Sequence, residues 1–307
     1  MGRWRYLPLL VPIVGLAEFG AQFFFSRRAP THDQWTEVRA LVASWYEAGD
    51  LVVIAPHWAE PMARWSFGDS LMPLRDVARP DATRYAKALE VSIVGSRSPE
   101  LAGWRLLRET KQGRFTLRAL ANPRPPVIAY DFVDHLDPNS ADVRLERGTT
   151  PSVCSFTTSA PVEGGGLGGP PIFPASRFTC PGEPSHVFVG VTIIDDEKFL
   201  ARRCIWSHPP GANGAIVTRF RGVPLGAKLH GHAGMGWLIE RDRAVPPFAI
   251  RILVAGVEVG NVVHEPGDGW KSFELPLGAA SGSQGDVEFH VSSAGAGTHV
   301  CFEVDSR

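Results

Sequence analysis

The first candidates for chemistry follow a short apolar run. His57, Trp58 and Glu60 come directly after Leu51–Ala55 and Pro56. A histidine and a carboxylate held close together can exchange protons as general base and acid, and an indole ring can stack on a sugar. The other interpretation is a loop histidine beside a packing tryptophan, because motifs of two or three residues often arise by chance. We take the three residues as ligand-binding candidates.

A second candidate is a pair of histidines. His230 and His232 flank Gly231, so in a strand both side chains would lie on one face. Such a pair can hold a metal ion only when a third ligand lies nearby. The sequence identifies no third ligand. We therefore keep both histidines as ligand-binding candidates and predict no metal site.

Two tryptophans beside glycines form a third group. Trp237 follows Gly236, and Asp268 lies two residues before Trp270 in a Gly-Asp-Gly-Trp stretch. A sugar could stack on either indole at such a loop–strand junction, and Asp268 is included as a ligand-binding candidate. The alternative is that both tryptophans belong to the core, where this residue type is more often found.

Acidic residues between positions 131 and 142 resemble a calcium loop only in composition. Asp131, Asp134, Asp137 and Asp142 could supply oxygen ligands to a structural calcium ion, but their spacing matches no EF-hand. A solvated acidic turn is the other interpretation. Apart from a structural calcium ion as this alternative, we predict no cofactor.

The chain has four cysteines, all in its second half and none in a C-x-x-C pair. Structural zinc sites usually take close-spaced pairs, so two disulfides are the better prediction. Cys204 lies in what reads as the first strand of a compact sandwich and Cys301 in its last, and such strands usually run side by side. We predict Cys204–Cys301, which leaves Cys154–Cys180, and an oxidising, extracytoplasmic location (periplasm or cell surface).

The N-terminal segment supports export. Leu7–Phe25 is almost entirely apolar and would span roughly 28 Å as a helix at about 1.5 Å per residue, close to the thickness of a bilayer core. We predict that residues 1–30 are a membrane anchor. A signal peptide cleaved before Glu18 and a buried helix of a soluble protein are the alternatives. Arginines on both sides, Arg3, Arg5, Arg27 and Arg28, leave the orientation open.

The next region, residues 31–123, alternates helical and extended patterns. Thr31 offers an N-cap to an amphipathic helix that Gly49 ends. We expect three strands, over Leu51–Ala55, Glu90–Val94 and Phe115–Leu120. We also expect two further helices, over Arg84–Leu89 and Pro99–Arg108. This order predicts a small α/β domain.

Residues 124–307 follow a proline-rich linker and show no helical period. Val287, Phe289 and Val291 alternate with polar residues, which is typical of a half-buried strand. Many short strands separated by turn residues predict an antiparallel β-sandwich of jelly-roll type. Residues 161–174 form a Gly/Pro-rich loop. The expected strands are Val127–Phe132, Asp142–Glu146, Val187–Ile193, Arg203–Ser207, Ala215–Phe220, Phe248–Val254, Glu258–Val263, Trp270–Leu275, Val287–Ser292 and His299–Val304.

Two parts of the chain resemble known families. The apolar N-terminal segment, Trp35, the stretch Gly49–Pro56 and the strand Gly113–Leu117 resemble the extracytoplasmic tail of polyprenyl-phosphate-sugar-dependent, family 39-like membrane glycosyltransferases. The resemblance covers about residues 1–123. Those enzymes carry their catalytic acids between many membrane helices, which have no counterpart here. It therefore implies association with glycan assembly, without catalysis by this chain.

The second resemblance covers about residues 200–307. Gly222–Gly226, Ile250–Val254 and Gly267–Trp270 followed by Phe273–Leu275 look similar to a carbohydrate-binding jelly-roll module. This resemblance implies a glycan ligand.

Charge and motifs exclude several functions. The 31 basic residues balance 32 acidic ones, so a nucleic-acid binder is not expected. No glycine-rich phosphate loop follows the first strand, and no nucleophile motif of the G-x-S-x-G kind is present. We predict a membrane-tethered, non-catalytic protein of the cell envelope that binds glycan. The alternatives are an enzyme of sugar transfer or hydrolysis with paired carboxylates, and a structural remnant of a larger glycosyltransferase.

Overall fold

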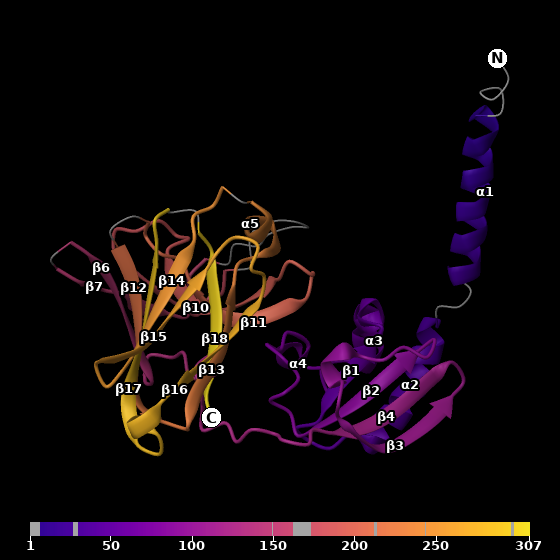
Figure 1. Cartoon of the computed structure of the whole chain (residues 1–307), viewed down its shortest axis with the longest axis horizontal. Helices are drawn as coiled ribbons and strands as arrows, with labels where there is room; N and C mark the ends of the chain where they lie inside the picture. The colour runs from indigo at the N-terminus through magenta and orange to yellow at the C-terminus, as the bar shows by residue number, and fades with distance from the viewer. Residues whose placement is uncertain are drawn as a thin grey trace. The chain divides into compact units, whose positions relative to one another are not determined.

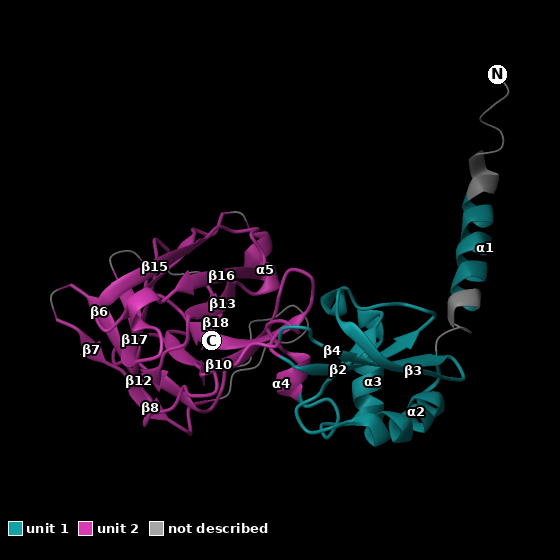
Figure 2. Cartoon of the chain, turned by 60° about the horizontal axis from the view of Figure 1, so that its bottom comes forward, with its two compact units in different colours: residues 1–73, 85–124 teal, residues 74–84, 125–307 magenta. Residues whose placement is uncertain are grey.

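The computed structural model describes residues 7–26, 30–148, 150–161, 173–211, 214–242, 244–295 and 298–307. The chain divides into two compact units (Figure 2). Unit 1 holds residues 1–73 and 85–124, and unit 2 holds residues 74–84 and 125–307. The sequence places a boundary after residue 123, close to this division. It does not predict that the segment 74–84 belongs with the second unit.

Helix α1 spans Leu7–Ser26, over the apolar run at the start of the chain (Figure 1). Within the described ranges, we find no helix that combines the length and the apolarity needed to cross a membrane. The four arginines that flank the run lie outside the described residues, and so do residues 162–172 of the predicted Gly/Pro-rich loop.

Unit 1 is built on a four-stranded sheet in the order β1-β2-β4-β3 (Figure 1). β1 and β2 run parallel, and the other two pairs are antiparallel. The strands are β1 (Leu51–Ala55), β2 (Lys87–Ile93), β3 (Arg105–Gln112) and β4 (Phe115–Ala121). The helices are α2 (His32–Trp45) and α3 (Glu60–Phe67), with single 3-10 turns η2 (His57–Ala59) and η3 (Pro99–Leu101).

Helix α2 begins where the sequence predicts. The Thr31 hydroxyl accepts a hydrogen bond from the Gln34 amide, and the Gln34 side chain accepts one from the Thr31 amide. This reciprocal cap satisfies two amides that the helix itself leaves free. The Trp35 side chain of α2 is 1 % exposed and lies against Phe115 of the sheet, with ring centroids 4.7 Å apart.

Two predicted helices of unit 1 are wrong. Over Arg84–Leu89 the structure has the start of strand β2, and over Pro99–Arg108 it has η3 followed by β3. Leucines and a tryptophan recur every three residues in the second stretch, which fits one face of a helix. Leu107 is nevertheless 47 % exposed on β3, the outer strand of the sheet. Pairing with β4 outweighs the local pattern, as tertiary context often does.

Unit 2 is a β-sandwich, as predicted. The larger sheet has eight strands, with the order β16-β13-β18-β11-β10-β9-β8 and β5 beside β18. The smaller sheet has six, in the order β15-β14-β17-β12-β6-β7. The strands are β5 (Tyr130–Asp131), β6 (Ala141–Arg147), β7 (Ser152–Val153), β8 (Ser155–Thr157), β9 (Arg177–Thr179), β10 (Phe188–Asp195), β11 (Ala201–Ser207), β12 (Gly214–Pro224), β13 (Lys228–Gly234), β14 (Phe248–Val254), β15 (Val257–His264), β16 (Lys271–Pro276), β17 (Gln284–Ser293) and β18 (Val300–Ser306).

The main core lies between the two sheets, because alternate residues of facing strands point inward. One buried cluster includes Phe220 and Ile250 of the smaller sheet and Ile205 and Leu229 of the larger. A second, smaller cluster lies on the other face of the larger sheet, where alternate residues of β11 and β18 point outward. Its buried members are Phe173, Phe188, Ile194, Cys204, Trp206 and Cys301.

Two disulfides cross-link the sandwich. Cys204 of β11 is bonded to Cys301 of the adjacent strand β18, with Cα atoms 5.6 Å apart. Cys154 is bonded to Cys180 with Cα atoms 4.1 Å apart. These are the two pairs that the sequence predicts.

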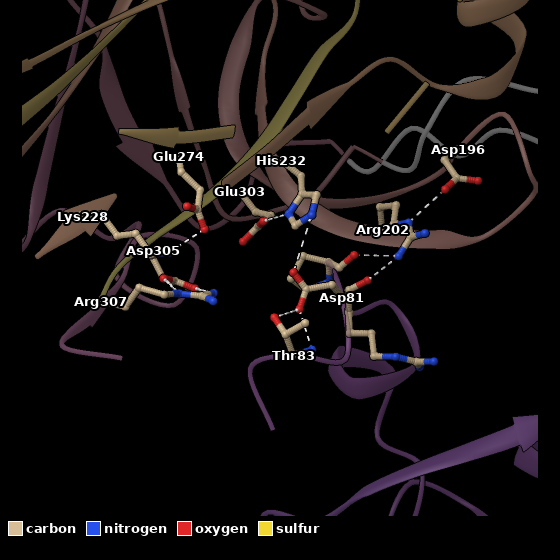
Figure 3. A network of polar contacts seen from close by, with 12 residues as sticks. Asp81, Thr83, Asp196, Arg202, Lys228, His232, Glu274, Glu303, Asp305 and Arg307 are labelled. Atoms are coloured by element: carbon tan, nitrogen blue, oxygen red, sulfur yellow. Dashed lines mark hydrogen bonds and ion pairs between the residues drawn. The ribbon is translucent and has the colours of Figure 1, made fainter. Parts of the chain in front are cut away.

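The segment 74–84 packs on the sandwich of unit 2 through its backbone. It begins with the short helix α4 (Leu74–Val77). Farther on, the Arg202 guanidinium donates hydrogen bonds to the carbonyl oxygens of Arg79 and Pro80, both at 2.9 Å. Arg202 also pairs with Asp196 at 3.0 Å. Figure 3 shows this arginine between Asp196 and the segment. The contacts fix the stretch that carries Asp81.

Candidate functional site

Three connecting segments of unit 2 meet in what we call the loop cluster: the turn 196–200 between β10 and β11, helix α5 (Trp237–Arg241), and the loop 265–270 between β15 and β16. Gly269 lies so close to the turn that a Cβ atom there would be 2.5 Å from Glu197 Oε1, and its φ of +71° also favours glycine. The turn also contacts α5, through the rings of Phe199 and Trp237.

The carboxylate of Glu240 fixes the loop to α5. Glu240 is 1 % exposed, and its Oε1 accepts hydrogen bonds from the amides of Gly267 at 2.6 Å and Gly269 at 2.9 Å. Its Oε2 lies 3.0 Å from His264 Nε2. Burial alone would raise the pKa of Glu240, but His264 and the two amides outweigh burial and hold the pKa below its ordinary value. An ionised carboxylate therefore holds the loop in place.

The loop cluster carries two aromatic rings in contact, which we call the ring pair. Phe199 is 56 % exposed, and its ring centroid lies 5.3 Å from that of Trp237. The guanidinium carbon of Arg241 lies 5.0 Å from the Phe199 centroid and 5.3 Å from the Trp237 centroid. Open aromatic surface with a cation fixed beside it can stack on the apolar face of a sugar.

Polar groups surround the ring pair in the same segments. Glu197 is half-buried, and its carboxylate makes no hydrogen bond or ion pair with another residue that the structure describes. Asp268 is exposed and pairs with Lys271 at 2.7 Å, and this hydrogen bond lowers the pKa of Asp268. Carboxylates of this kind accept hydrogen bonds from hydroxyl groups. The loop cluster thus combines ring surface with acceptors.

Trp270 has the environment of a packing residue. It lies half-buried against the outer apolar cluster of the larger sheet. Its ring stacks on that of His232 at 5.9 Å, and the Arg202 guanidinium lies 5.9 Å from its centroid. The indole nitrogen is buried and has no hydrogen-bond partner among the described residues. Of the two tryptophans considered from sequence, only Trp237 contributes to the ring pair.

His230 and His232 lie on one face of β13, as their spacing predicts, and are 9 % and 7 % exposed. Asp81 of the segment 74–84 joins them, and one potential ligand atom from each of the three lies within 4.8 Å of the others. Figure 3 shows Asp81 facing His232, with Glu303 beside the same ring. Asp81 supplies the third ligand that the sequence does not identify.

The candidates in unit 1 lie at the start of α3. His57 Nε2 and Glu60 Oε2 are 3.7 Å apart, so the structure brings these two together as an acid–base interpretation requires. The Trp58 side chain is 63 % exposed. It is therefore a surface residue rather than a packing one.

The aspartates considered for calcium each have a partner of their own. Asp131 pairs with Arg84, Asp134 with Arg203, and Asp142 with Arg221. Asp137 caps the following turn, accepting hydrogen bonds from the amides of Asn139 and Ser140. Their oxygens are used in four different places, and this arrangement does not support the calcium alternative.

Sequence reasoning misses six residues of these sites: Glu197, Phe199, Glu240, Arg241, Asp81 and Glu303. Phe199 had a signal, because it follows Asp-Asp-Glu-Lys, a polar turn pattern that would put an apolar residue at a hairpin tip. Arg241 lies four residues after Trp237, which is contact spacing on a helix, but no helix was expected there. Asp81 had no local signal, because only the packing of the segment 74–84 brings it to β13.

Comparison with known proteins assigns the chain to no family. No protein-family model and no curated protein matches the chain, so the resemblance of residues 1–123 to glycosyltransferase tails gains no support. Several solved structures are similar at low identity. The CBM51-2 and INT domains of Clostridium perfringens ZmpB in complex with GlcNAc give a TM-score of 0.28 at 9 % identity, over 38 % of this chain and 25 % of that one.

Two further structures give similar values. The CBM51 of Clostridium perfringens GH95 in complex with methyl-galactose matches with a TM-score of 0.27 at 13 % identity, over 38 % of this chain and 81 % of that one. The CBM22-1 and GH10 modules of Clostridium thermocellum Xyn10B with xylohexaose match with a TM-score of 0.26 at 8 % identity, over 38 % and 24 %. The chain spans about a quarter of the length of the first structure. The function is therefore inferred from the geometry of the site.

Proposed function

We propose that the β-sandwich of unit 2 binds a glycan at the loop cluster, and that the protein is a non-catalytic component of the cell envelope. The single observation that carries the proposal is the ring pair. Phe199 is 56 % exposed beside Trp237, and the Arg241 guanidinium lies over both rings. The free energy of the system falls when a sugar face covers an apolar ring that was open to water.

The neighbouring polar groups support the same ligand class. A pyranose presents an apolar face and a rim of hydroxyl groups, so its site needs ring surface bordered by hydrogen-bond acceptors. Glu197 and Asp268 supply carboxylates from the two segments next to α5. Because Glu240 holds the loop 265–270, the loop that carries Asp268 is ordered before any ligand arrives, which lowers the entropy cost of binding.

The disulfides support an extracytoplasmic location, because such bonds persist in oxidising compartments. Tethering by the N-terminal segment and association with glycosyl transfer are parts of the proposal that rest on the sequence.

The test is a glycan array probed with the purified full chain, followed by calorimetry with the strongest glycan. Phe199→Ala and Trp237→Ala are each expected to weaken binding by about tenfold or more, since about 1.4 kcal/mol of lost ring contact is a factor of ten in affinity. Circular dichroism establishes that each variant keeps the sandwich fold.

Trp65→Ala is the matched control. Trp65 lies on α3 of unit 1 and is 69 % exposed, so its loss removes an open aromatic ring without touching the loop cluster. Binding by this variant should equal that of the wild type. If both ring-pair variants bind as the wild type does, the site assignment is wrong, and if the array yields no glycan, the function is wrong.

The rival function is hydrolysis or transfer of sugar by paired carboxylates. Incubating the bound glycan with the full chain and analysing the products by mass spectrometry separates the two. Intact glycan is expected from a binding protein. Cleaved or extended glycan would support the enzyme.

A further inference from the structure

We propose that Asp81, His230 and His232 bind one divalent transition-metal ion of the Zn²⁺ class. This site is separate from the ring pair. It lies on the outer face of the larger sheet of unit 2, where the segment 74–84 meets β13 (Figure 3). One potential ligand atom from each side chain lies within 4.8 Å of the other two.

Strand β13 sets the two imidazoles side by side. His230 and His232 alternate with Leu229 and Ala233, which are fully buried on the core side of the sheet. The histidines therefore point away from the core, and their ring centroids are 5.2 Å apart. Gly231 between them allows the close packing, because a Cβ there would lie 2.4 Å from the Glu303 carbonyl oxygen. Local sequence thus presents two nitrogen ligands on one face.

Asp81 completes the set from a distant part of the chain. One of its oxygens, Oδ1, accepts hydrogen bonds from the amide and the hydroxyl of Thr83, at 2.7 and 2.6 Å. The other oxygen, Oδ2, faces His232 Nε2 at 3.5 Å. The carboxylate is therefore held in one orientation by its own turn, and its second oxygen is directed at the histidine.

Glu303 orients the ring of His232. Glu303 on β18 is 2 % exposed, and its Oε1 lies 2.5 Å from His232 Nδ1. A proton shared on that side leaves the Nε2 lone pair directed at Asp81. Histidines that bind metals usually donate their other N–H to a carboxylate in this way, which fixes the tautomer and makes the ligand nitrogen more basic. Glu303 is a positioning residue for the proposed metal.

His230 gives the second, independent indication of a ligand. It is 91 % buried, being 9 % exposed, and its Nδ1 has no hydrogen-bond partner among the described residues. A buried polar atom left without a partner destabilises the fold, and a bound water or ion is one way to satisfy it.

The ligand types select the metal. Two imidazoles with one carboxylate suit Zn²⁺ and its neighbours, whereas Ca²⁺ and Mg²⁺ prefer sites made of oxygen alone. Three protein ligands leave a fourth position for water or another ligand. Because Asp81 comes from the segment 74–84 and the histidines from β13, the ion would also cross-link this segment to the sandwich.

The experiment uses the untagged full chain, stripped with EDTA and titrated with Zn²⁺ alone by calorimetry and thermal unfolding. One Zn²⁺ should bind per chain, and a hundredfold excess over Kd should raise the Tm by about 5–10 °C. Ca²⁺ and Mg²⁺ should leave the Tm unchanged. Asp81→Asn and His230→Gln should each abolish this binding. Glu303→Gln should weaken it by about 10–100-fold while keeping the same stoichiometry.

His290→Gln is the matched control. His290 is 7 % exposed and also pairs with a glutamate, but it lies on β17 of the other sheet. It should bind Zn²⁺ as the wild type does. Unchanged binding in both Asp81→Asn and His230→Gln would overturn the proposal, as would no binding by the wild type. Should the variants fail to fold, X-ray absorption at the zinc edge of the wild type decides: two imidazoles support the site, and a different ligand set contradicts it.

Discussion

Acid is expected to destabilise unit 2 through His299. This residue lies just before β18, with its ring centroid 4.8 Å from that of Trp206 and 5.4 Å from that of His208. Burial, together with the nearby His208 and His186, lowers the pKa of His299 to about 4. In the unfolded chain the pKa is about 6.5.

The direction of the pH effect follows from the number of protons that the folded and the unfolded chain bind. Below pH 6.5 the unfolded chain takes up a proton at His299 that the folded protein does not, so the free energy of unfolding falls as the pH falls. With pKa values of about 4 folded and 6.5 unfolded, the loss is about 2 kcal/mol at pH 5 and about 3 kcal/mol at pH 4. Above pH 7.5 the residue contributes almost nothing to the pH dependence.

His299→Gln removes this titration. Urea unfolding of unit 2 at pH 7.5, 5 and 4 should show that the wild type loses more stability than the variant, by the amounts given above. His57→Gln in unit 1 controls for the loss of a histidine. An NMR titration of the His299 ring measures its pKa directly. A value near 6.5, or equal losses in wild type and variant, would refute the reasoning.

Three further predictions concern the disulfides, the loop and the N-terminus. Replacing Cys204 and Cys301 by Ala should lower the free energy of unfolding by about 4–5 kcal/mol, and the same change at Cys154 and Cys180 should lower it by about 3–4 kcal/mol. The difference is expected because the two bonds close loops with separations of 97 and 26 residues. Equal losses in urea unfolding would argue against the loop-length explanation. Glu240→Ala should cost about 3–5 kcal/mol and raise hydrogen exchange in 265–270, because it leaves His264 and three amides unpaired; unchanged exchange would show that Glu240 does not hold the loop. Carbonate extraction should leave the full chain with the membrane, as the apolar run Leu7–Phe25 predicts; release into the supernatant would rule out an anchor.

The sandwich could be predicted because several of its strands alternate between apolar and polar residues. Val287, Phe289 and Val291 are fully buried, as expected from the pattern, and the turn Ala255–Gly256 joins β14 to β15. Such patterns report which face of a strand is covered, so they need no knowledge of distant contacts. Strand β13 was not predicted, because its sequence Lys-Leu-His-Gly-His-Ala-Gly has few strand-forming residues.

The sites were predictable only in part. His230, His232 and Trp237 have local signals, namely their spacing and neighbouring glycines. Asp81 reaches the histidines through the packing of the segment 74–84, whose backbone Arg202 holds at Arg79 and Pro80. No sequence pattern encodes a contact of that kind. Glu303 was missed for a similar reason, because its partner His232 lies on β13, a strand that was not predicted.

The most direct test of glycan binding follows the indole N–H signals of the nine tryptophans by NMR while the array-selected glycan is added to the full chain. The signal of Trp237 should shift, because its ring belongs to the ring pair. The signals of the exposed Trp58 and Trp65 of unit 1 should stay in place. A shift confined to Trp58 or Trp65, with Trp237 unmoved, would contradict the proposed site.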